Sequence, residues 1–124
     1  MATVTPAAQV QVATTRRIFE VWKWAGVNEA DDCERVLCAG HADKTVYFLS
    51  AGAFGGSLTF EVTPEPNTAS DRYVTAKDAL TGNAISGVAA EAAHTIMETC
   101  YAARPTAGAG VAGVDVYLVL SSVK

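Results

Sequence analysis

The 124-residue sequence has little charge and no extended basic segment. Its formal net charge is −4, and its longest basic run is Arg16-Arg17. Because a surface that binds nucleic acid needs a larger basic patch, we do not expect direct binding to nucleic acid. No apolar run approaches the length of about 18 residues that a membrane helix needs. The first residues lack the basic and apolar regions of a signal peptide, so synthesis in the cytoplasm and no membrane contact are expected.

The sequence also lacks the short motifs of common enzymes. It has no GxSxG nucleophile motif, no HExxH zinc motif, and no Lys-Ser/Thr after the glycines of 52–56. Glu61 and Glu65 resemble a glycosidase pair only in residue type, since Glu61 alternates outward on an expected strand and Glu65 lies between two prolines. We therefore assign no catalytic residues and expect that the protein is not an enzyme.

Three cysteines, Cys33, Cys38 and Cys100, form an odd set. In a reducing compartment such residues are buried free thiols. Cys33, Cys38 and His41 place three possible metal ligands within nine residues. Their spacing matches no usual zinc pattern, and no second pair of ligands follows. We expect neither a bound metal nor another cofactor.

Alternating apolar residues predict an all-β protein. Apolar residues alternate in Ser57–Thr63 and in Val114–Leu120, which is typical of half-buried strands. The segment Thr45–Ala51 is also apolar, and the glycine-rich break at 52–56 lies between it and Ser57–Thr63. Two such segments separated by glycines predict a hairpin, which we place at the centre of the domain.

The remaining segments bring the expected number of strands to about eight. Short strands are predicted at Arg35–Ala39 and Tyr73–Lys77. Residues 88–104 fit a helix or a strand, and we favour a strand over His94–Arg104 that ends at Pro105. This strand count predicts a single β-sandwich or jelly-roll-like domain over residues 16–124.

The first 27 residues contain the candidate interface. Residues 1–15 are expected to form an N-terminal arm or an edge strand, in which Val10 and Val12 alternate with glutamines. Arg16–Val27 is a predicted strand with apolar groups on both faces, and Trp22 and Trp24 share one of them. Either both faces are covered, or the tryptophans lie at a subunit contact, or they form a platform for a sugar.

A series of short motifs runs in a fixed order from about residue 17 to residue 122. The segments DKTV at 43–46, FGGSLT at 54–59, GNAI at 82–85, ARPTAG at 103–108 and VDVYL at 114–118 occur in that order. In this order they resemble small virion proteins of tailed bacteriophages. Those proteins have a Gly-Ser segment with a tryptophan after the glycine-rich turn, whereas this chain has TPEPN at 63–67.

The resemblance implies a β-sandwich on the surface of the virion and no catalytic residues. It implies a capsid decoration (cement) protein, which binds the major capsid protein at joints between subunits and forms homotrimers. Two other functions remain open. One is a β domain of the tail or baseplate, and the other is a carbohydrate-binding module that uses Trp22 and Trp24.

Overall fold

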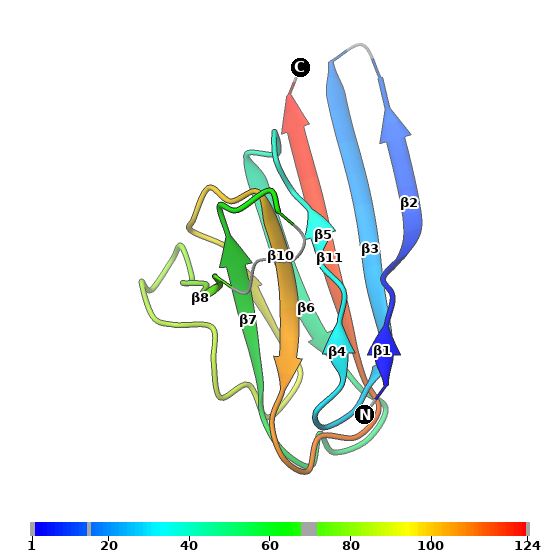
Figure 1. Ribbon diagram of the computed structural model, residues 1–124. Helices are drawn as coiled ribbons and strands as arrows, with labels where there is room; N and C mark the ends of the chain where they lie inside the picture. Colours follow the sequence, from blue (N-terminus) through cyan, green and yellow to red (C-terminus); the bar gives the residue numbers. More distant parts are fainter. Residues whose placement is uncertain (1, 15, 68–71, 124) are drawn as a thin grey trace.

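The computed structural model describes residues 2–14, 16–67 and 72–123. The described residues form eleven strands and no helix, and they are arranged as two facing sheets with a short additional strand pair (Figure 1). The prediction of an all-β sandwich is confirmed, with more and shorter strands than expected. Within these residues no helix is long and apolar enough to cross a membrane.

The larger sheet has five antiparallel strands and contains the strand that alternates most clearly. This strand, β11, pairs with β3 on one side and with β6 on the other, so that Leu118 lies opposite both Trp22 and Val46. The strand order across the sheet is β2 (Ala7–Ala13), β3 (Arg17–Val27), β11 (Val114–Val123), β6 (Asp43–Leu49) and β9 (Ala92–Thr95).

The smaller sheet covers one face of the larger sheet, and Figure 1 shows both sheets in one view. The order of its strands is β5 (Val36–Leu37), β10 (Ala102–Ala107), β7 (Leu58–Thr63) and β8 (Val74–Thr75). A parallel pair, β1 (Thr3–Val4) and β4 (Asp32–Cys33), contacts β3 of one sheet and β10 of the other. This pair therefore closes one side of the sandwich.

The prediction of a central hairpin is wrong. Its two strands, β6 and β7, lie in different sheets, and residues 50–57 cross between them. The alternation in Ser57–Thr63 nevertheless predicts the buried face of β7 correctly, because Leu58, Phe60 and Val62 are all buried in the core. Alternation shows which side of a strand is buried, but it does not show which strand is the neighbour.

The glycines of the crossing loop are needed for close backbone contact rather than for a tight turn. Gly55 and Gly110 have φ angles of 79° and 85°, in the left-handed region. A Cβ atom on Gly55 would lie 2.4 Å from the carbonyl oxygen of Gly110, and one on Gly110 would lie 2.6 Å from that of Gly55. The two loops that enter β7 and β11 therefore pack backbone against backbone at one end of the sandwich.

The predicted strand over His94–Arg104 is also corrected. The chain forms β9 in the larger sheet, crosses at residues 96–101, and then forms β10 in the smaller sheet. Pro105 does not end a strand but lies within β10, opposite Phe60. Because β5 pairs only with Ala102 and Ala103, Pro105 faces a free edge on that side, where the missing N–H costs little.

The core lies between the two sheets and is rich in aromatic side chains. The Trp24 ring meets Phe60 edge to face, with ring centroids 6.1 Å apart, so it joins the sheets directly. The indole N–H of Trp24 donates a hydrogen bond to the carbonyl oxygen of Glu34 at 2.7 Å. Its polar atom is thus satisfied although the side chain is fully buried.

Candidate interaction surface

The five-stranded sheet buries only one of its faces. Val116, Leu118 and Leu120 of β11 are fully buried against the smaller sheet, so the residues between them point to the opposite side. No described strand covers that side. We call it the outer face, and its apolar residues are Val10 and Val12 of β2, Phe19 and Val21 of β3, Tyr117 and Val119 of β11, and Tyr47 and Leu49 of β6.

The apolar residues of the outer face are aligned across the strands. Val21 lies opposite Val10 on one side and opposite Val119 on the other. In the next row, Tyr117 lies opposite Tyr47. Val10 and Val12 are 41% and 47% exposed, and Tyr47 is 38% exposed, so these side chains are open to contact. The result is an apolar band across four strands rather than a set of isolated surface residues.

The charge within this band is locally neutralised. Lys23 follows Val21 on the outer face, and its ammonium lies 3.7 Å from the Asp115 carboxylate and 5.3 Å from the centre of the Tyr117 ring. Hydrogen bonding to Tyr117, followed by the attraction of Asp115, raises the pKa of Lys23 above its ordinary value. Lys23 is therefore charged but has partners within the same face.

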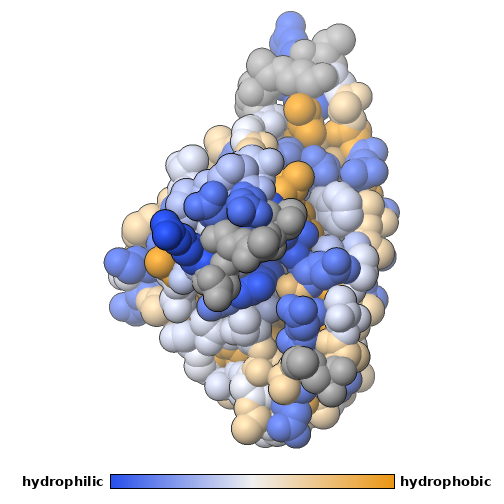
Figure 2. Space-filling view, in the orientation of Figure 1, coloured by the Kyte–Doolittle hydropathy of each residue, from blue (hydrophilic) through white to orange (hydrophobic). Residues whose placement is uncertain are grey.

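One end of the sheet projects beyond the rest of the sandwich. Figure 1 shows the ends of β2 and β3 extending past the smaller sheet, and Figure 2 shows a few hydrophobic residues below the hydrophilic tip of this end. Every residue of β2 is exposed, and among the described strands β2 pairs with β3 alone, so it forms an edge of the larger sheet. Neither charged residues nor proline protect this edge, although a bulge lies between Ala8 and Val10.

The structure separates the four residues of the predicted interface. Val10 and Val12 lie on the outer face of the edge strand, whereas Trp22 and Trp24 point to the inner face. Trp24 is fully buried and offers no surface to a partner or a sugar. Trp22 is partly buried against the core, and its indole N–H donates to Glu20 Oε1 at 3.0 Å. The two rings therefore do not form an exposed platform.

Sequence reasoning did not assign the partly buried apolar residues on the other face of β3 to the candidate interface. Phe19 and Val21 alternate with the tryptophans on β3 and form the middle of the outer face. A signal for them was available, since the same two-residue spacing recurs in Tyr47–Leu49 and Tyr117–Val119. Recognising it required the pairing of β3, β11 and β6, which is not local in sequence.

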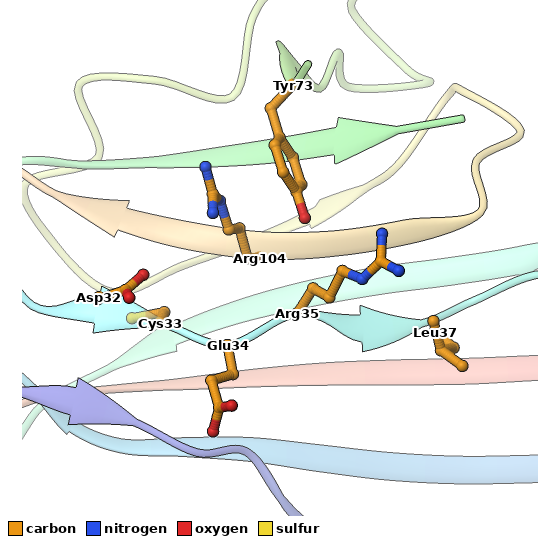
Figure 3. A pocket seen from close by; sticks show the side chains of 7 residues that line it. All are labelled: Asp32, Cys33, Glu34, Arg35, Leu37, Tyr73 and Arg104. Atoms are coloured by element: carbon orange, nitrogen blue, oxygen red, sulfur yellow. The ribbon is translucent and has the colours of Figure 1, made fainter. Parts of the chain in front are cut away.

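A hollow of about 450 Å³ lies on the other side of the molecule, between β4–β5 and β10 (Figure 3). The Arg104 guanidinium stacks 3.8 Å from the centre of the Tyr73 ring and lies 3.3 Å from Glu61 Oε1. Arg35 donates hydrogen bonds to the carbonyl oxygens of Glu65 and Pro66 at 2.8 and 2.7 Å. Arg35 thus fixes residues 65–66 after β7, and Arg104 contacts both Tyr73 and β7.

The two histidines each contact one carboxylate. His94 Nδ1 lies 2.7 Å from Asp78 Oδ2, and His41 Nε2 lies 3.0 Å from Glu20 Oε2. The hydrogen bond from His94, together with those from the Leu80 and Thr81 backbone N–H groups, lowers the pKa of Asp78. Asp78 therefore stabilises a turn.

The residues considered as a metal site are not brought together. Cys38 contacts Cys100, while His41 contacts Glu20. In the ranges 2–14, 16–67 and 72–123, no three His, Cys, Asp or Glu side chains are grouped as metal ligands would be. Over the same ranges, no hydroxyl or thiol group forms a hydrogen bond with His94 of the kind a catalytic triad requires.

The described residues thus form a two-sheet β-sandwich with one apolar, uncovered sheet face. No protein-family model matches the chain, and no curated protein matches it. Among solved structures, the fold is similar to that of the SPBc2 prophage-derived protein YomS, with a TM-score of 0.65 over 90% of this chain and 99% of that one. The two sequences are 11% identical, so the likeness shows a shared fold.

Proposed function

We propose that the protein is a structural component of a bacteriophage virion, and that it is a capsid decoration (cement) protein. Two observations support the phage assignment, namely the order of the sequence motifs and the fold shared with a prophage-derived protein. The proposal of a binding role rests on the outer face. An apolar band over four strands with a neutralised charge pair is suited to lie against another protein.

The proposed partner is the major capsid protein. Tyrosine and aliphatic residues dominate the outer face, a composition that fits a protein surface rather than phosphate groups or lipid headgroups. The free edge of β2 borders the same face at Val10 and Val12. An extended capsid segment would pair with the β2 backbone and pack its side chains on these valines.

We also propose that three copies associate as a homotrimer on the capsid lattice. The resemblance to virion proteins supports this number of copies. Three linked copies that each bind the shell weakly would remain attached through avidity, which suits a protein that offers only adhesive surface. This function needs no catalysis, and we propose none. Sedimentation analysis of the purified protein tests the trimer, and a monomer at capsid-binding concentrations would contradict it.

Electron cryomicroscopy of virions of the phage that encodes this chain tests the proposal as a whole. We expect additional density for a small β-sandwich over the joints of the capsid lattice, lost in particles made without the gene. Density at the tail or baseplate would contradict the decoration role and establish the alternative. Absence of the protein from purified virions would overturn the phage structural assignment. A carbohydrate-binding module is no longer proposed, because Trp24 is buried.

A further inference from the structure

Two thiols that are far apart in sequence meet at the edge of the smaller sheet. Cys38 directly follows β5, and Cys100 lies just before β10. The antiparallel register of β5 and β10 continues past Leu37, because the Cys38 N–H donates to the Tyr101 carbonyl oxygen at 2.8 Å. This pairing leaves the Cys38 and Cys100 Sγ atoms 2.8 Å apart, about 0.8 Å more than a disulfide bond of about 2.05 Å.

The pair is buried, but its two members differ in access to solvent. Cys38 is 1% exposed and Cys100 is 7% exposed. The hydrogen bond between the two sulfur atoms lowers the pKa of Cys100, while the same contact and burial raise the pKa of Cys38. Cys100 is therefore the thiol that is better suited to react first, since the thiolate is the nucleophile.

The third cysteine provides an internal comparison. Cys33 of β4 is also buried, but among the described residues no second sulfur atom contacts it. Burial raises the pKa of the Cys33 thiol to about 12, so the reactive thiolate is scarce at neutral pH. The chain thus contains one poised pair and one inert thiol.

We infer that Cys38 and Cys100 form an intramolecular disulfide when the protein leaves a reducing environment and meets a disulfide oxidant such as oxidised glutathione. The proximity of the two sulfur atoms and the pairing of β5 with β10 carry this inference. It does not depend on the proposed capsid role. In reducing cytoplasm the pair remains a dithiol.

The reaction has two steps of thiol–disulfide exchange. The Cys100 thiolate attacks one sulfur of oxidised glutathione, forms a mixed disulfide and releases one glutathione thiolate. Cys38 then gives up its proton to solvent and attacks the Cys100 sulfur, which releases the second glutathione. The two protein thiols lose two electrons and two protons, and one oxidised glutathione becomes two reduced molecules.

The bond would join strands that come from distant parts of the chain. Cys38 and Cys100 are 62 residues apart, so the disulfide closes a large loop in the unfolded chain. Such a closure lowers the entropy of the unfolded state, and we expect the melting temperature to rise by roughly 10 °C on oxidation.

Thiol titration in denaturant, after incubation of the folded, reduced protein with excess oxidised glutathione, tests the inference. We expect the wild type to fall from three free thiols to one, with a mass loss of two hydrogen atoms and a Cys38–Cys100 peptide after digestion. Cys33→Ser should lose the same two thiols and show the same rise in melting temperature.

Cys100→Ser is the complementary variant and should form no intramolecular disulfide. Three free thiols in the oxidised wild type would overturn the inference, and so would a bridge that includes Cys33. The wild-type measurement and Cys33→Ser together decide the question. The inference can therefore be overturned even if Cys100→Ser fails to fold.

Discussion

Replacing Gly110 with alanine tests whether the two sheet-crossing loops touch backbone to backbone. Gly110 has a φ angle of 85°, and an L-residue in the left-handed region costs about 1–2 kcal/mol. The new Cβ would lie 2.6 Å from the Gly55 carbonyl oxygen, so one of the loops must also move. Overpacking of this kind costs about 1–3 kcal/mol, which gives an expected loss of about 2–5 kcal/mol in the free energy of unfolding.

Gly113 in the same loop provides the matched control. Its φ angle is 67°, but a Cβ there would meet no atom within 4 Å. Gly113→Ala should therefore lose only the conformational part, about 1–2 kcal/mol. Urea unfolding followed by tryptophan fluorescence compares the two variants, with the midpoint read at unchanged slope. Equal destabilisation of Gly110→Ala and Gly113→Ala would refute the close packing of the loops.

Two further predictions concern single side chains of the sandwich. Trp24→Ala should lower the free energy of unfolding by about 3–5 kcal/mol, because the ring fills the space between the sheets and its N–H bonds to Glu34; urea unfolding measures this loss. The ionised Asp78 carboxylate stabilises the folded state. This stabilisation is fully present above the ordinary pKa of 3.8 and is lost as the pH falls through the lowered pKa of Asp78 in the folded state. The melting temperature should therefore fall more steeply with decreasing pH for the wild type than for Asp78→Asn, and parallel pH profiles would contradict a stabilising Asp78 carboxylate.

Local sequence pattern predicts the buried side of β7 and β11 but not the neighbours of each strand. Leu58, Phe60 and Val62 are correctly predicted to share one face, yet the glycines before their strand allow either a hairpin or a crossing to the second sheet. In the crossing that forms, Gly55 packs against Gly110, which is far from it in sequence. Such non-local contact leaves no mark on the period of either strand.

The candidate surface illustrates the same limit. The two-sided apolar pattern of β3 leaves open whether both faces are covered or the tryptophans lie at a contact, and the structure covers the tryptophan face. The pattern does not show whether the tryptophans or Phe19 and Val21 are the covered residues, because both faces alternate equally well. The pairing with β11 decides this, since Leu118 and Trp22 point together toward the smaller sheet.

The two valines of the edge strands allow a direct test of the central claim, that the outer face binds the capsid. Val12 of β2 is 47% exposed on the outer face, and Val74 of β8 is 59% exposed at the edge of the smaller sheet. Because both side chains are exposed, glutamate at either position should leave the melting temperature nearly unchanged. The same substitution at the two positions therefore separates binding from stability.

The decisive measurement is co-sedimentation of these variants with capsid shells that lack their native copy of the protein. We predict that Val12→Glu binds at least about tenfold more weakly than the wild type, because a carboxylate would be buried without a partner, and that Val74→Glu binds normally. Wild-type binding by Val12→Glu, or an equal loss in both variants, would contradict the assignment of the outer face as the docking surface.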